Sequence, residues 1–164
     1  MLLFLVLSAV IIGTCQSTSE AAESYRIMRF VENGWKNEDI MPILYVTHPN
    51  LTYSMCGYTG NIDTFPAYLL NQFKTLNSVN FLTDFDSAEI NEQDGIQYLK
   101  FHVQSDAIYN DKREVKGGAD VVAVKTDGDD FRMVTINQQC RFVTTPYHRL
   151  YQLFTKENLY DYKK

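Results

Sequence analysis

The sequence predicts a single α+β domain in which helices precede a β-sheet. Apolar residues recur with helical spacing in the first half of the chain, whereas the second half alternates with the two-residue period of strands. The dipeptide Asp127-Gly128, placed between two β-rich segments, is typical of a hairpin turn. No linker rich in Pro, Gly or Ser divides the 164 residues, and this length suits one domain with its own core.

The first segment has the pattern of a secretory signal peptide. Residues 2–12 are apolar except for Ser8, and so short a run cannot cross ~30 Å of hydrocarbon. Gly13 and Cys15 are small enough for the −3 and −1 positions of a cleavage site, so we expect removal of residues 1–15. A buried N-terminal helix is the alternative, because no Lys or Arg precedes the apolar run. Acylation of Cys15 is disfavoured by the preceding Thr14.

An extracellular location sets the chemistry expected for two cysteines and one asparagine. Cys56 and Cys140 remain after cleavage, and an oxidising compartment favours one disulfide between them over two separate buried thiols. Closing a loop across 84 residues contributes roughly 4 kcal/mol in the chain-entropy model. The triplet Asn50-Leu51-Thr52 is an N-glycosylation sequon, so Asn50 is the predicted glycan site.

The charge of the chain excludes some classes of partner. The formal net charge is −5 and the isoelectric point is about 5.1, whereas nucleic acid requires a basic surface. No dense Lys/Arg run is present to hold the protein on an anionic membrane, and no second long apolar run follows the signal. Aromatic residues make up 13% of the chain and supply much of the apolar area for a core.

Two helices are predicted in the first half. Residues 19–34 form one helix, capped by Ser19 and ending at Asn33-Gly34, and residues 37–41 add one turn before Pro42. Residues 65–75 form the second helix, with Pro66 at an early position that tolerates proline. Its predicted core-facing stripe consists of Phe65, Leu69, Leu70 and Phe73.

Strands account for most of the remaining chain. Residues 43–47 and 51–56 are short extended segments, and residues 79–90, 96–109, 120–126 and 131–143 form a four-stranded antiparallel sheet. Residues 111–118 are expected to be a charged loop. In residues 96–109, Leu99, Phe101 and Val103 share the core face. The domain therefore spans residues 20–143, and residues 144–164 form a polar, Tyr-rich tail.

This order of elements resembles the nuclear-transport-factor-2-like superfamily, the cystatin-like α+β cone. The resemblance rests on the element order, on the blocks Met55-Cys56-Gly57-Tyr58 and Phe65-Pro66-Ala67-Tyr68-Leu69-Leu70, and on the final hairpin. It implies a curved sheet around a conical cavity. The chain is similar to small secreted roundworm members, which carry cysteines at the places of Cys56 and Cys140. The resemblance also allows a homodimer through the open sheet face.

One set of side chains could support catalysis in such a cavity. Tyr98, His102 and Asp106 are spaced by four and share one face of a strand, where an imidazole base and a carboxylate could transfer a proton. The core face of the same strand is the opposite one, so a solvated position is favoured for all three. The three histidines lack metal-ligand spacing, and no cofactor or metal is expected.

The sequence favours a secreted, non-catalytic binding or interaction domain. Its partner is expected to be a small apolar ligand or an extracellular protein. One alternative is a small lyase or isomerase that uses cavity side chains. A second alternative is a lipocalin-like carrier of an apolar ligand, although Gly34 and Trp35 are adjacent where lipocalins have Gly-x-Trp, and the helix at 65–75 falls where a barrel needs strands.

Overall fold

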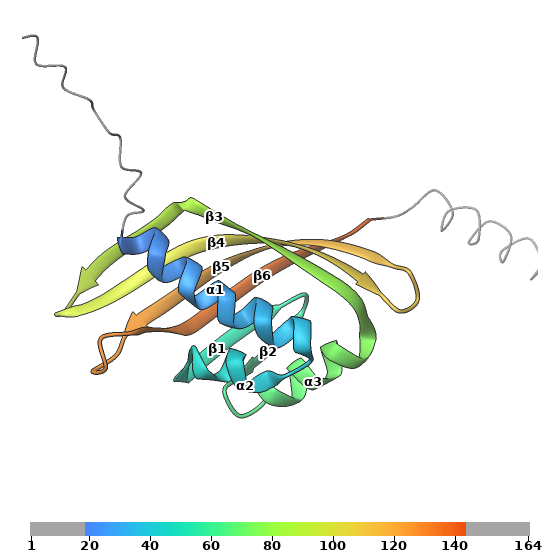
Figure 1. The fold of residues 1–164 in the computed structure, drawn as a ribbon, viewed down its shortest axis with the longest axis horizontal. Helices are drawn as coiled ribbons and strands as arrows, with labels where there is room; N and C mark the ends of the chain where they lie inside the picture. Colours follow the sequence, from blue (N-terminus) through green and yellow to red (C-terminus); the bar gives the residue numbers. More distant parts are fainter. Residues whose placement is uncertain (1–18, 144–164) are drawn as a thin grey trace, which may run out of the picture.

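The structure of the protein is a computed structural model, which describes residues 19–143 (Figure 1). The predicted signal peptide at 1–15 and the predicted tail at 144–164 lie outside the described residues. Helices and strands follow one another in the order α1 (Ser19–Asn37), α2 (Ile40–Tyr45), β1 (Thr47–Met55), β2 (Tyr58–Asn61), α3 (Phe65–Thr75), β3 (Leu76–Gln93), β4 (Ile96–Tyr109), β5 (Glu114–Lys125) and β6 (Phe131–Val143).

One open, curved sheet contains all six described strands, in the order β2-β1-β6-β5-β4-β3. Strands β3 to β6 form the predicted antiparallel meander. The predicted number of four strands is wrong, because β2 pairs with β1 and β1 pairs in parallel with β6. The parallel pair brings Tyr53 opposite Ile136. No local sequence pattern encodes a pairing between segments so far apart in the chain.

The sheet curves over the helices, which all lie on its concave side (Figure 1). The core lies between these two layers. Leu99, Phe101 and Val103 are buried there, which confirms the predicted core face of β4. Other buried residues come from every helix and from β1, β5 and β6, and include Ile27, Ile43, Leu51, Phe65, Leu69, Val121, Met133 and Ile136.

Helix α3 and strands β4 and β6 have the predicted boundaries, while other predictions are wrong. Residues 40–45 form α2, where an extended segment was expected from 43. The Asp39 carboxylate caps this helix by accepting a hydrogen bond from the Met41 N–H at 2.9 Å, and Pro42 is tolerated in the first turn. Leu70 belongs to the predicted core stripe of α3 but is 46% exposed.

Another wrong prediction concerns the charged loop at 111–118. Strand β5 already begins at Glu114, because its first residues have pairing partners on both sides. Gly117 lies opposite Ser105 of β4 and opposite Cys140 of β6. Glycine disfavours strands locally, but a central position in the sheet overrides that preference.

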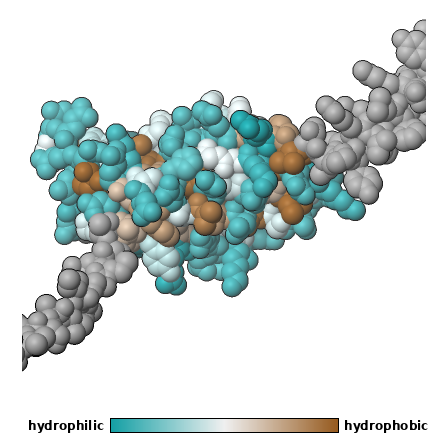
Figure 2. Space-filling model, turned by 90° about the horizontal axis from the view of Figure 1, so that it is seen from above, coloured by the Kyte–Doolittle hydropathy of each residue, from teal (hydrophilic) through white to brown (hydrophobic). Residues whose placement is uncertain are grey.

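The face of the molecule shown in Figure 2 is mostly hydrophilic. Hydrophilic residues cover most of that face, and hydrophobic residues occur in separate spots. Within residues 19–143, every helix is too short or too polar to span a bilayer.

Candidate functional site

A cavity of about 90 Å³ lies between the concave face of the sheet and helices α1 and α3, and it is partly open to solvent. Most of its lining is apolar, so it forms as a gap in the hydrophobic core. The apolar lining includes Val31, Trp35, Phe65, Leu69, Phe81, Val103, Val121 and Met133. Trp35 contacts the ring of Phe73 edge-on, with 4.9 Å between the ring centroids, and this contact holds the indole beside the cavity.

Five neutral polar side chains also line the cavity: Tyr68, Gln72, Ser105, Tyr109 and Gln138. Tyr68 and Gln72 come from α3, on the side of the helix that faces the sheet. Ser105 and Tyr109 come from β4, and Gln138 comes from β6. Such a small set of polar groups in an apolar pocket is typical of a site that orients a ligand.

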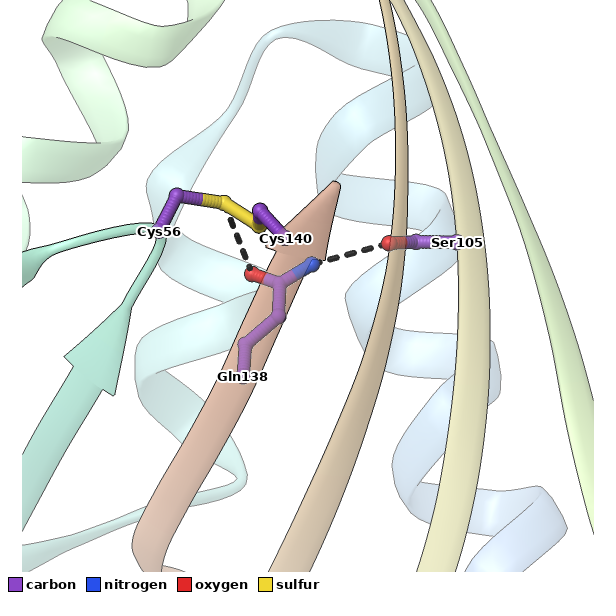
Figure 3. The surroundings of a disulfide bond; sticks show 4 residues. All are labelled: Cys56, Ser105, Gln138 and Cys140. Atoms are coloured by element: carbon purple, nitrogen blue, oxygen red, sulfur yellow. Dashed lines mark hydrogen bonds between the residues drawn. A yellow bond between two sulfur atoms is a disulfide. The ribbon is translucent and has the colours of Figure 1, made fainter. Parts of the chain in front are cut away.

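Two of these side chains bind each other below the disulfide (Figure 3). The amide nitrogen of Gln138 donates a hydrogen bond to the Ser105 hydroxyl at 2.8 Å. The amide oxygen of Gln138 lies 3.8 Å from the sulfur of Cys56. A disulfide sulfur carries no hydrogen, so this second approach is a contact and leaves the amide oxygen available as an acceptor.

The predicted disulfide between Cys56 and Cys140 is present, with 5.0 Å between the two Cα atoms. Cys56 follows β1 in a tight turn, where its φ of 52° is left-handed. Cys140 lies near the end of β6. The disulfide therefore fastens the parallel β1–β6 pair at the rim of the cavity, on the same side as Gln138.

A cluster of tyrosines surrounds Tyr68 at this end of the cavity. Its ring lies 5.3 Å from that of Tyr53 and 6.0 Å from that of Tyr58, between centroids. Burial raises the pKa of Tyr68 well above its ordinary value, and the neighbouring phenols Tyr109, Tyr53 and Tyr58 raise it further. The Tyr68 hydroxyl is therefore neutral at physiological pH and acts as a hydrogen-bonding group.

Tyr109 lies next to the turn between β4 and β5, where the cation Arg113 contacts its ring. Burial raises the pKa of Tyr109, and the Arg113 guanidinium partly opposes this rise. That guanidinium lies 4.8 Å from the centroid of the Tyr109 ring. It also forms an ion pair with Asp111 at 2.6 Å, so its charge already has a partner at the protein surface.

Solved structures provide the comparison for this arrangement, since no protein-family model and no curated protein matches the sequence. An NTF2-like superfamily protein (nuclear transport factor 2) from Salmonella enterica is 12% identical, with 79% of this chain and 96% of that chain covered and a TM-score of 0.59. This chain has the NTF2-like fold. The resemblance predicted from the sequence is thereby confirmed at the level of fold, while the similarity to secreted roundworm members stays a prediction.

Two other NTF2-like neighbours carry names that suggest an activity. A proposed aromatic ring hydroxylase from Novosphingobium aromaticivorans is 12% identical, covers 76% of this chain and 93% of its own, and has a TM-score of 0.61. A proposed ketosteroid isomerase from Shewanella frigidimarina is 9% identical, covers 76% of this chain and 98% of its own, and has a TM-score of 0.55. At these identities the likeness concerns the fold alone.

The open sheet and α3 also differ from the closed barrel of the lipocalin alternative.

The three side chains singled out from the sequence do not line the NTF2-like cavity. His102 lies on the outer face of the sheet, where its Nδ1 atom is 2.9 Å from Asp120 Oδ1. Asp106 lies on the same outer face, 3.8 Å from the amine of Lys116. Tyr98 is also absent from the lining. The structure thus does not bring these groups together around the cavity, which offers no support for a proton-transfer site built from them.

Sequence reasoning missed Gln72, Ser105 and Gln138, although two of them carried a usable signal. Ser105 continues the two-residue period of Leu99, Phe101 and Val103, so it belongs to the inward face. Gln72 follows Phe65 and Leu69 on the helical stripe of α3 and is 7% exposed. Polar residues at core-facing positions need a partner or a function. Gln138 had no comparable signal, because β6 alternates less regularly.

Asn50 lies in β1 and is exposed, as is Thr52, whereas Leu51 between them is buried. The predicted break between the extended segments at 43–47 and 51–56 is wrong, because residues Thr47–Met55 form one strand. The irregularity of the β1–β6 pairing falls between Thr47 and Thr52. Within residues 19–143, no group of three or more His, Cys, Asp or Glu side chains could hold a metal ion.

Proposed function

We propose that this protein is a secreted binding protein whose cavity holds a small, predominantly apolar ligand, without catalysis. The observation that carries the proposal is the chemistry of the lining. Its residues, all within the described range, are apolar or carry a neutral polar group, and none is Asp, Glu, His, Lys or Arg. Apolar burial supplies the affinity of such a site, and a few hydrogen bonds supply the orientation.

The size of the cavity limits the ligand. An engineered apolar cavity of roughly 150 Å³ binds benzene. The cavity here measures about 90 Å³, so a compact ligand of a few carbon atoms fits with little adjustment. A longer ligand needs either movement of the lining side chains or a tail that leaves through the open side.

A cavity-based lyase or isomerase is the second candidate function, because the neighbours include a proposed isomerase and a proposed hydroxylase. The phenols of Tyr68 and Tyr109 could donate hydrogen bonds to a substrate carbonyl. Efficient proton transfer at neutral pH also requires a group with a pKa near 7. The described lining contains no such group, and His102 and Asp106 lie on the outer face, so binding is favoured.

Secretion is supported by three features of the chain. The apolar segment at residues 2–12 matches a signal peptide. Cys56 and Cys140 are close enough to pair, and disulfides persist in oxidising compartments. The sequon at Asn50 is exposed to a glycosylating enzyme. The N-terminus of protein recovered from the medium of eukaryotic cells, together with its mass before and after removal of N-glycans, tests this part.

Native mass spectrometry of the protein purified from its own source tests the binding role. We expect the measured mass to exceed that of the mature, glycosylated chain by the mass of a small molecule. This molecule should dissociate when the collision energy is raised. A complex with another extracellular protein, and no small molecule, would replace the cavity proposal by a protein-interaction role. The same spectrum reports whether the protein is a homodimer. Turnover of a bound ketone or enol by the purified protein would favour the isomerase candidate.

A further inference from the structure

The polar groups in the cavity point to the chemical class of its ligand. We infer that the cavity selects neutral ligands with a hydrogen-bonding end group and rejects carboxylates of the same size. This inference rests on the binding function proposed above. It is carried by Gln72, which lines the cavity, is 7% exposed and has no side-chain hydrogen bond to any described residue. No fully buried side-chain nitrogen or oxygen of residues 19–143 lacks a partner, so the polar atoms of this amide retain some contact with solvent.

Gln72 is an unusual choice for its position. It lies on the same stripe of α3 as Phe65 and Leu69, which are almost fully buried. A primary amide has two N–H donors and an acceptor oxygen, and a bound ligand that cut them off from solvent would have to hydrogen-bond to them. The neighbouring positions on this stripe are apolar, so an apolar residue would serve packing better. A ligand that both accepts and donates hydrogen bonds would satisfy the amide.

The Ser105–Gln138 pair adds further capacity of the same kind. Ser105 uses its oxygen as the acceptor for the Gln138 amide, so its own hydroxyl hydrogen remains to be donated. The Gln138 amide oxygen contacts only the disulfide sulfur and can accept a hydrogen bond. Together with Gln72, the cavity therefore offers unused donors and unused acceptors, which suits an alcohol or a primary amide.

Among residues 19–143, no charged side chain lines the cavity to act as a counter-ion for a charged ligand. A carboxylate that enters an apolar cavity loses its hydration, and only a nearby cation or several strong donors could replace it. The Arg113 guanidinium contacts the ring of the lining residue Tyr109, and Asp111 already pairs with this cation at 2.6 Å. A neutral amide of the same shape loses much less hydration free energy on entry. The cavity should therefore bind the amide more tightly than the carboxylate because of the difference in charge.

Trp35 provides a direct measurement. It is the sole tryptophan of the chain and lines the cavity, so its fluorescence reports occupancy. Pentanamide and pentanoate have nearly the same shape and differ in charge, and n-pentane serves as the apolar reference. At pH 7.5 we expect pentanamide to bind at least about tenfold more tightly than pentanoate. Binding of the acid should recover as the pH falls toward the ordinary carboxyl pKa of about 4–5.

Two matched variants separate the role of Gln72 from general packing. Gln72→Leu should weaken pentanamide binding about fivefold or more and leave n-pentane unchanged or tighter. Gln104→Leu makes the same replacement at an exposed position of β4 and should change neither the binding of pentanamide nor that of n-pentane. Ser105→Ala, a smaller change, should also weaken pentanamide and not n-pentane, and it keeps the test decisive if Gln72→Leu fails to fold.

Different results would overturn the proposed binding function and the proposed selectivity for neutral ligands. Equal or tighter binding of pentanoate at pH 7.5 would overturn the selectivity while leaving the binding function intact. Weakening of n-pentane and pentanamide to the same extent by Gln72→Leu would overturn the role of the amide. If none of the three probes changes the emission of Trp35, the proposed binding function falls, and the selectivity falls with it.

Discussion

The side-chain amide of Gln138 donates a hydrogen bond to the hydroxyl of Ser105 across β5, at 2.8 Å. The two residues are separated by 33 positions in the chain, and Gly117 of the strand between them lies opposite Ser105, beside the hydrogen bond. A side chain there would occupy the space that the hydrogen bond crosses. The hydrogen bond thus connects β4 to β6 at the rim of the cavity, next to the disulfide.

Removal of the Gln138 amide should destabilise the protein modestly. Gln138→Ala loses the hydrogen bond to Ser105, which contributes about 1 kcal/mol to the free energy of unfolding. Gln139→Ala is the matched control, because Gln139 is exposed and its loss should change stability by less than about 0.5 kcal/mol. Urea unfolding measures both. Equal losses for Gln138→Ala and Gln139→Ala would contradict a stabilising role for the hydrogen bond.

Substitution of two adjacent glycines should have unequal effects. A Cβ atom at Gly117 would lie 2.8 Å from the Gln138 amide nitrogen and 3.0 Å from the Ser105 hydroxyl. We therefore expect Gly117→Ala to reduce the free energy of unfolding by about 1–3 kcal/mol through overpacking.

Gly118→Ala is the comparison variant. A Cβ atom at Gly118 meets only the His102 imidazole, at 3.1 Å. That side chain is partly exposed on the outer face and can move aside, so the expected loss is smaller than for Gly117→Ala. Thermal unfolding of the two variants ranks them, and a greater loss for Gly118→Ala would contradict the packing described around Gln138.

The Cys56–Cys140 disulfide should account for a large share of the stability. Replacement of both cysteines by alanine frees a loop spanning 84 residues, for which the expected loss is about 2–4 kcal/mol. Unfolding of oxidised and reduced wild-type protein provides the control, since reduction should reproduce the loss of the double variant. Peptide mapping of unreduced protein checks the cross-link directly. Alkylation of both cysteines without prior reduction would contradict it.

Stability should fall at alkaline pH because of Tyr68. Burial raises the pKa of its phenol, so the folded protein favours the neutral form. This contribution is complete below the ordinary tyrosine pKa of about 10 and is lost as the pH rises through the higher pKa of the folded state. Urea unfolding between about pH 8 and 11 should show a decline that is shallower for Tyr68→Phe. An unchanged decline in that variant would assign the effect to other groups.

His102 should be dispensable for ligand binding. Its imidazole lies on the outer face, paired with the exposed carboxylate of Asp120. An exposed pair of this kind contributes about 0–1 kcal/mol. His102→Ala should leave the response of Trp35 to pentanamide unchanged, and Asp120→Ala should behave alike. A loss of binding or of turnover in His102→Ala with an unchanged fold would restore the histidine as a functional candidate.

Periodicity along the chain was enough to predict part of the fold and little of the site. The boundaries of α3, β4 and β6 follow from local patterns, and so does the inward face of β4. Ser105 and Gln72 could have been recognised as polar residues at inward-facing positions. Gln138, the hydrogen-bond partner of Ser105, could be recognised as a cavity residue only once the pairing of β6 with β5 was known.

The sequence by itself determined the α+β class and the outward position of His102, because period and residue type encode these features locally. It also determined the choice of Cys56 and Cys140 as partners, because these two cysteines remain after the predicted cleavage. Only the tertiary structure decided the parallel β1–β6 pairing, the cavity and the hydrogen bond between Ser105 and Gln138. These features join segments distant in sequence. Their geometry depends on how the sheet curves over the helices, which no short stretch of the chain specifies.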